Sequence, residues 1–218
     1  MKGLILKDLY SMRQTLKMAA IIFVIWAVIF LPSGDGSFFL SCSVLMAAVV
    51  FLGTFSYEEA AKWAKYALTL PISRKKLIFS KYMTFLLLLL AALLLGFVVT
   101  TIGDVILRGG ISPGLYESMF TSMCIGLLFG SIVLPLIYRF GIEKARIALI
   151  VVALVPTGVI ALSNLAPGML DTFFAKASAL FGAGGPLHVL LYALPLVVLL
   201  LYYLSYLLSV RLYAKVDL

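Results

Sequence analysis

The residues best suited to acid–base chemistry in this sequence are the adjacent Glu58 and Glu59, which follow a long apolar run. A Glu-Glu-x-x-x-Arg motif at such a place would be typical of a CAAX-type intramembrane protease, but position 63 is Trp. His188 is the only histidine, and the zinc motif His-Glu-x-x-His does not occur. We therefore expect no catalytic or metal-binding residue in this chain, and a multi-span membrane enzyme stays only as an alternative function.

Nucleotide binding through a phosphate loop is also excluded by the sequence. The motif Gly-x-x-x-x-Gly-Lys-Ser/Thr, whose backbone amides cradle phosphates, occurs nowhere in the chain. We therefore expect no cofactor bound to this chain. If the protein works with ATP, the nucleotide and its Mg²⁺ must be bound by a separate partner subunit.

The basic residues are concentrated in one segment, residues 58–82. Only 12% of the chain is charged, yet this segment holds six of the seventeen Lys and Arg residues: Lys62, Lys65, Arg74, Lys75, Lys76 and Lys81. One role of a positive loop is to orient the neighbouring helices in the membrane, and that role alone would explain the charge. The helical spacing and turn chemistry of this segment favour a second role, as a docking surface on that side of the membrane.

The first half of the segment has the pattern of a short helix. One polar stripe at helical spacing is formed by Glu58, Lys62, Lys65 and Thr69, in which Glu58 and Lys62 form an i,i+4 pair. Small and apolar residues cover the rest, and Trp63 with Tyr66 suits the depth of the lipid headgroups. This pattern predicts a helix that lies in the plane of the membrane interface.

The second half of the segment predicts a break and a new helix. Pro71 ends the first helix after Leu70, because the residue before proline disfavours helical geometry. Ser73 has the residue type and position of an N-cap, and the next helix runs through Arg74 and Lys75 into an apolar run. The sequence thus predicts a rigid helix–break–helix elbow at the membrane surface.

The elements that position this elbow are long and apolar. The chain is 64% hydrophobic with a mean hydropathy of +1.17, which excludes a soluble domain. Five of six apolar runs have 19 or more residues, enough to cross a bilayer, whereas the first has 14 and needs Thr15 and Leu16 to span. We predict an all-α integral membrane protein, a single transmembrane domain over residues 1–218 with six spans. The runs are residues 18–31, 38–57, 83–102, 119–138, 147–165 and 187–210.

The distribution of charge also favours six spans. With six crossings, fifteen of the seventeen basic residues fall on one side, and only Arg108 and Lys176 fall on the other. The positive-inside rule then places both termini and residues 58–82 in the cytoplasm. This asymmetry accounts for the net charge of +8 without nucleic acid as a partner, because the basic residues are not gathered on a soluble, aromatic-laced face.

Two further segments have amphipathic patterns. Residues 1–17 combine leucines with lysine and arginine, and predict an N-terminal interfacial helix leading into the first span. Residues 167–186 predict a re-entrant or amphipathic helix in the outer leaflet, with a surface loop as the alternative. The four apolar residues on the predicted face of that outer helix are Leu170, Phe173, Phe174 and Phe181.

The fourth apolar run contains a stripe of small residues. Ser122, Gly126 and Gly130 recur every four residues, a spacing that lets another helix approach closely. Packing within the chain and an interface between subunits both fit this pattern.

The residues of the predicted elbow resemble a hallmark of the small bacterial ABC-2 type transporter permeases. The matching strings are Tyr57-Glu58-Glu59, Lys62-Trp63, Lys65-Tyr66, Leu70-Pro71-Ile72-Ser73-Arg74-Lys75 and Ser80-Lys81-Tyr82, together with the start Met1-Lys2-Gly3-Leu4-Ile5-Leu6-Lys7-Asp8. The resemblance covers the whole chain in length and number of spans. It implies a type V exporter-like fold with six helices, an N-terminal interfacial helix and outer-leaflet helices between the last two spans.

The resemblance also implies a function. The chain would be the permease subunit of an ATP-binding cassette exporter in the bacterial plasma membrane, forming a homodimer or heterodimer and using two copies of a separate ABC ATPase. The segment 58–82 would be the coupling element that docks into a cleft of the ATPase. Its coupling residues would be Glu58, Glu59, Lys62, Trp63, Lys65, Leu70, Pro71, Ser73, Arg74 and Lys75.

The substrate is indicated only as a class. The apolar spans and the aromatic outer segment favour an amphipathic or hydrophobic molecule, such as an antimicrobial or toxic peptide or a lipid-like compound. An ion-coupled secondary transporter is the alternative from another class. Such a transporter normally carries ionisable residues within its spans, and the predicted spans have essentially none.

Overall fold

The computed structural model of the chain describes residues 2–34, 36–63, 66, 73–112, 114–142, 144 and 188–214. Every regular element within these residues is a helix, which confirms the predicted all-α fold. The helices are α1 (Lys2–Ser11), α2 (Arg13–Ser33), α3 (Gly36–Ala60), α5 (Arg74–Arg108), α6 (Leu115–Phe140) and α9 (His188–Ala214).

Five of these helices are long and apolar enough to cross a membrane: α2, α3, α5, α6 and α9. They correspond to the first four and the sixth of the predicted spans. The fifth predicted span, at 147–165, lies outside the described residues. The same holds for the predicted outer helix of 167–186, with Leu170, Phe173, Phe174 and Phe181.

The short first apolar run becomes a full-length helix by extension at its start. α2 begins at Arg13 and has 21 residues, so Thr15, Leu16 and Lys17 belong to it. Gly34 ends α2 in a left-handed conformation with φ of 96°, which glycine adopts without a steric cost. The N-terminal helix α1 correspondingly ends at Ser11 rather than at residue 17.

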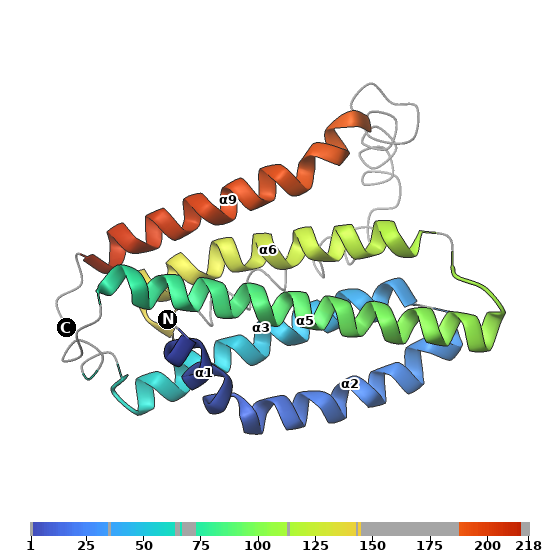
Figure 1. Cartoon of the computed structure of the whole chain (residues 1–218), viewed down its shortest axis with the longest axis horizontal. Coiled ribbons are helices and arrows are strands. Elements are labelled where there is room, and N and C mark those ends of the chain that lie inside the picture. The colour runs from blue at the N-terminus through green and yellow to red at the C-terminus, as the bar shows by residue number, and fades with distance from the viewer. Residues whose placement is uncertain are drawn as a thin grey trace, which may run out of the picture.

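The long helices lie side by side along the long axis of the molecule (Figure 1). α3, α5 and α6 pack on one another at the centre; α9 packs on α6 and α5, and α2 packs on α3 and α5. α2 buries little against the rest, and its Ile21, Val24 and Val28 side chains are 58%, 59% and 70% exposed. Such a surface fits a lipid environment, where apolar side chains need no cover from water.

The stripe of small residues on α6 faces other helices of the same chain. The hydroxyl of its first member, Ser122, lies 3.0 Å from Ser41 Oγ on α3. A Cβ atom added to Gly126 would collide with Leu89, and one added to Gly130 would collide with Phe85, both on α5. The geometry corresponds to packing within the chain, the first of the two alternatives.

One end of the bundle gathers the segments that carry most of the basic residues. The last turns of α3, α6 and α9, the first turn of α5, and α1 all lie at this end, on the left of Figure 1. The turns between α2 and α3 and between α5 and α6 lie at the opposite end. The fold therefore brings together segments that are far apart in the sequence and for which we predict one side of the membrane.

Candidate functional site

The acids Glu58 and Glu59 lie in the last turn of α3, which is continuous from Gly36 to Ala60. The prediction of a separate surface helix through Glu58, Lys62 and Lys65 is therefore wrong at its start. The apolar run extends helically into the acids because Tyr-Glu-Glu-Ala contains no helix breaker. The helix then stops, and Lys62 adopts a left-handed φ of 50°.

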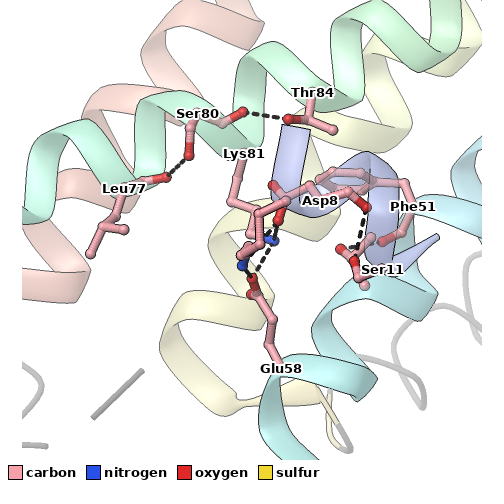
Figure 2. A network of polar contacts seen from close by, with 10 residues as sticks. Asp8, Ser11, Phe51, Glu58, Leu77, Ser80, Lys81 and Thr84 are labelled. Atoms are coloured by element: carbon pink, nitrogen blue, oxygen red, sulfur yellow. Dashed lines mark hydrogen bonds and ion pairs between the residues drawn. The ribbon is translucent and has the colours of Figure 1, made fainter. Parts of the chain in front are cut away.

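Glu58 pairs with lysines from two other helices, not with Lys62 as predicted. Lys81 Nζ on α5 lies 2.8 Å from Glu58 Oε1 and 2.9 Å from Asp8 Oδ1 on α1. Lys7 Nζ lies 3.1 Å from Asp8 Oδ1 and also forms an ion pair with Glu58. Figure 2 shows Asp8, Glu58 and Lys81 converging from α1, α3 and α5. We call Lys7, Asp8, Glu58 and Lys81 the ion cluster.

The side chains of the ion cluster are largely buried. The exposed fractions of the side chains are 1% for Asp8, 8% for Lys81, 17% for Glu58 and 28% for Lys7. Two positive and two negative groups balance one another, which is the condition under which charges are buried in proteins. Asp8 Oδ2 accepts no hydrogen bond from the described residues, so the cluster is not fully saturated.

Aromatic rings complete the surroundings of both lysines. Lys7 Nζ lies 4.1 Å from the centre of the Trp63 ring, and Lys81 Nζ lies 5.0 Å from the centre of the Phe55 ring. Both distances are within the range of cation–π attraction. A cavity of about 400 Å³ adjoins the cluster and is lined by residues of α1, α3, α5, α6 and α9, including Tyr138.

The predicted N-cap at Ser73 is confirmed. Ser73 has an extended backbone with ψ of 145°, and its hydroxyl accepts a hydrogen bond from the Lys76 amide at 3.4 Å. α5 begins at the next residue, Arg74, whose guanidinium donates to the Tyr213 carbonyl at 3.3 Å and lies 5.9 Å from the ring of the same residue. The start of α5 is thereby attached to the end of α9.

The other residues of the predicted elbow divide into two sets. Glu59, Lys62 and Lys75 are exposed and lie beside the ion cluster or at the start of α5, where a partner can reach them. Lys65, Leu70 and Pro71 lie outside the described residues, so the predicted break at Pro71 stays a prediction.

Three residues of the ion cluster, Lys7, Asp8 and Lys81, are not among the predicted coupling residues, although they occur in the strings that resemble the permease family. A signal for them exists. Asp8 is one helical turn from both Leu4 and Met12, and Met12 is fully buried, so Asp8 is a charged residue on the apolar face of α1. Lys81 likewise lies on the face of α5 that buries Ile78.

The opposite end of α5 carries a second, simpler ion pair. Arg108 lies 3.5 Å from the buried Asp104, one turn earlier in the helix. Asp104 also accepts a hydrogen bond from the Ser112 amide at 3.2 Å, and Arg108 donates to the Gly34 carbonyl at 3.4 Å. This pair connects the two turns at that end. Within the described part of the chain, no three His, Cys, Asp or Glu side chains lie together as metal ligands.

The sequence matches one family model, described as "ABC-2 family transporter protein", over residues 3–214. The match includes all six described helices almost in full and all four residues of the ion cluster. No curated protein and no solved structure is significantly similar to the chain.

Proposed function

We propose that this chain exports an amphipathic or hydrophobic molecule. The chain belongs to the ABC-2 transporter family, and is therefore a multi-pass membrane permease subunit that associates with an ABC ATPase. The energy comes from ATP hydrolysed on the separate ATPase subunit. Two permease chains, identical or related, and two ATPase subunits form the complex in a bacterial plasma membrane. The termini and the segment between α3 and α5 face the cytoplasm.

The observation that carries the proposal is the exposed charge at one end of the bundle. Glu59 lies in the last turn of α3, Lys62 follows the end of that helix, and Lys75 lies in the first turn of α5 after the Ser73 cap. These charges have both signs and lie on elements anchored in the bundle. A soluble ATPase that docks there pushes on two spans directly, because α3 and α5 continue from the docking residues across the membrane.

The distribution of charge along the spans supports the substrate class. No Asp, Glu, Lys or Arg occurs between residues 82 and 103 of α5, or between residues 118 and 138 of α6. The polar groups of these stretches are uncharged, such as the hydroxyls of Thr84, Thr100 and Ser122. Spans of this composition suit an amphipathic or lipid-like molecule and disfavour ion-coupled transport, which normally uses charged groups within the membrane.

Charge reversal at the exposed residues tests the proposed docking surface. We expect Glu59→Arg combined with Lys75→Glu to weaken binding of the ATPase by about 30-fold, because loss of a desolvated interfacial charge costs roughly 2 kcal/mol or more. Binding is measured with the purified ATPase and the permease in detergent. The matched control is Glu117→Arg, an exposed acid at the opposite end of the bundle. Equal affinity of the double variant and the control would contradict docking at this end.

A further inference from the structure

We propose that the ion cluster is a clamp that makes α1 move together with the ends of α3 and α5, so that the push of the ATPase also reaches α2. This inference rests on the proposed function and goes beyond it. Asp8, Glu58 and Lys81 are then positioning residues for energy transfer rather than contacts to the ATPase. Glu58, which the sequence indicates as a docking residue, acts inside the chain.

The first step of the argument is geometric. Lys81 bridges carboxylates from two different helices, at 2.9 Å from Asp8 and 2.8 Å from Glu58. Glu58 adjoins the exposed Glu59, and Lys81 lies two turns after the Ser73 cap. A displacement of the segment between α3 and α5 therefore acts on two members of the ion cluster directly, and on α1 through them.

The second step concerns the joint between α1 and α2. A single residue, Met12, separates the two helices, and it is fully buried. The Met12 amide donates to the Asp8 carbonyl at 3.1 Å, and the Leu16 amide donates to the Met12 carbonyl at 2.7 Å. Met12 is therefore buried and hydrogen-bonded to both helices, and through this single residue a movement of α1 is passed to α2.

The third step concerns what else holds α1. Leu6, Leu9 and Tyr10 are 54%, 41% and 66% exposed, so this face of α1 is largely open. Asp8 and Met12 are the fully buried residues of this region. Within α1 the attachment to the bundle is therefore made at the ion cluster, and the apolar contact of Met12 with Ala19 and Val50 follows at the end of the helix.

The fourth step concerns the choice of charged residues. A buried ion pair adds little net stability compared with well-packed apolar residues of the same shape, whereas removal of one partner is costly. A group of four charges is therefore a poor means of stabilising α1 but an effective means of fixing its position. Directional contacts of a lysine with two carboxylates specify one arrangement of three helices.

The test uses the complex of the chain with its ABC ATPase in lipid nanodiscs. The first readout is the stimulation of ATPase turnover by the permease, expressed per intact complex. We expect the Lys81→Met variant to bind the ATPase, but the stimulation of ATPase turnover should fall about tenfold, which is a typical size for coupling between two sites. Glu58→Gln is the second variant, in case Lys81→Met does not fold. Lys81→Arg keeps the positive charge between Asp8 and Glu58 and should retain the stimulation.

The second readout is the distance between α1 and α5 with and without bound ATP. If the ion cluster had a purely structural role, its loss would not make this distance depend on ATP. Spin labels at Tyr10→Cys on α1 and Leu87→Cys on α5 report whether the two helices move as one body; both positions are exposed. The distance should stay the same with and without bound ATP in the native complex, and should change on ATP binding in Lys81→Met. Arg108→Met is the matched control, since it removes an ion pair at the other end of α5.

Each result decides the inference. Normal stimulation and a constant distance in both Lys81→Met and Glu58→Gln would overturn the inference. It would also be overturned if these variants lowered only the yield of intact complexes, while the complexes that formed were stimulated normally. A native chain that binds no ABC ATPase would instead contradict the proposed function, and the clamp with it. Loss of stimulation in Arg108→Met as well would show a general loss of packing and would also overturn the clamp.

Discussion

Glu58 and Glu59 are neighbours in the sequence with different surroundings. Glu58 is 17% exposed and pairs with Lys7 and Lys81, whereas Glu59 is exposed. The two acids therefore have separate roles, one in the interior of the chain and one on the surface that we propose for the ATPase. A sequence pattern alone gives both residues the same role.

The first prediction separates the two acids by stability. Glu58→Gln removes a charge that faces two lysines and should lower the melting temperature of the detergent-purified protein, because a buried charge loses its partner at a cost of several kcal/mol. Glu59→Gln is the matched control and should change the stability by about 0.5 kcal/mol or less, as surface substitutions usually do. Equal melting temperatures for the two variants would contradict the buried position of Glu58.

The second prediction concerns the stripe of small residues on α6. Gly130→Ala should destabilise the protein by about 1–3 kcal/mol, because the added Cβ collides with Phe85 in a packed interior. The matched control is Gly53→Ala in α3, where an added Cβ meets nothing within 4 Å and helix propensity favours alanine. Thermal unfolding of both variants measures the difference, and a Gly130→Ala variant as stable as Gly53→Ala would refute the close approach.

At the scale of the elements, α9 is attached to α5 by a buried polar contact. The Tyr82 hydroxyl on α5 lies 2.8 Å from Ser205 Oγ and 2.7 Å from Ser209 Oγ on α9. The Tyr202 hydroxyl donates to the Tyr82 carbonyl at 2.8 Å. Since apolar packing within a membrane is not driven by exclusion of water, such hydrogen bonds contribute to the choice of the packing partner.

The third prediction follows from this contact. Tyr82→Phe removes a hydroxyl that meets two serines and should lower stability by about 1 kcal/mol, the typical net contribution of a hydrogen bond. Tyr203→Phe, at a residue that is 60% exposed on α9, is the control and should have little effect. Melting temperatures of the two variants in the same detergent provide the comparison. If both variants melt at the native temperature, the hydroxyl does not attach α9 to α5.

The helices themselves could be predicted from the sequence, because length and apolar content determine which segments span a membrane. The same holds for the Ser73 cap, a local interaction between residues three apart. The end of α3 could not be predicted as well. Glu58, Lys62 and Lys65 fit a helical stripe, but Lys62 adopts a left-handed φ instead. The stronger partners of Glu58 come from α1 and α5, and periodicity contains no information about such distant contacts.

At the scale of the whole molecule, the asymmetry of charge coincides with the arrangement of the helices. The described segments that we predict to be cytoplasmic lie at one end of the bundle (Figure 1). Arg108 is the last residue of α5, which ends at the other end. The fold places these segments at one end of the bundle, and the positive-inside rule predicts that this end faces the cytoplasm. This orientation places the exposed charges beside the ion cluster where a cytoplasmic ATPase can reach them.

The fourth prediction concerns this orientation. In a background with Cys42 and Cys124 replaced by serine, a membrane-impermeant maleimide should label Gly110→Cys in intact cells but not Lys62→Cys. Both introduced cysteines are at exposed positions at opposite ends of the bundle. Labelling of Lys62→Cys after cell lysis is the control for reactivity. Reaction of Lys62→Cys in intact cells would contradict the orientation.

The central claim is that the chain is a permease whose energy comes from a separate ABC ATPase. The most direct measurement compares ATP hydrolysis by the purified chain alone, by the ATPase subunit alone and by their complex in nanodiscs. We expect no hydrolysis by the chain, which lacks a phosphate loop, and a turnover in the complex that differs from that of the free ATPase because the permease controls it. Hydrolysis by the chain alone, or an ATPase turnover that the chain leaves unchanged, would contradict the account.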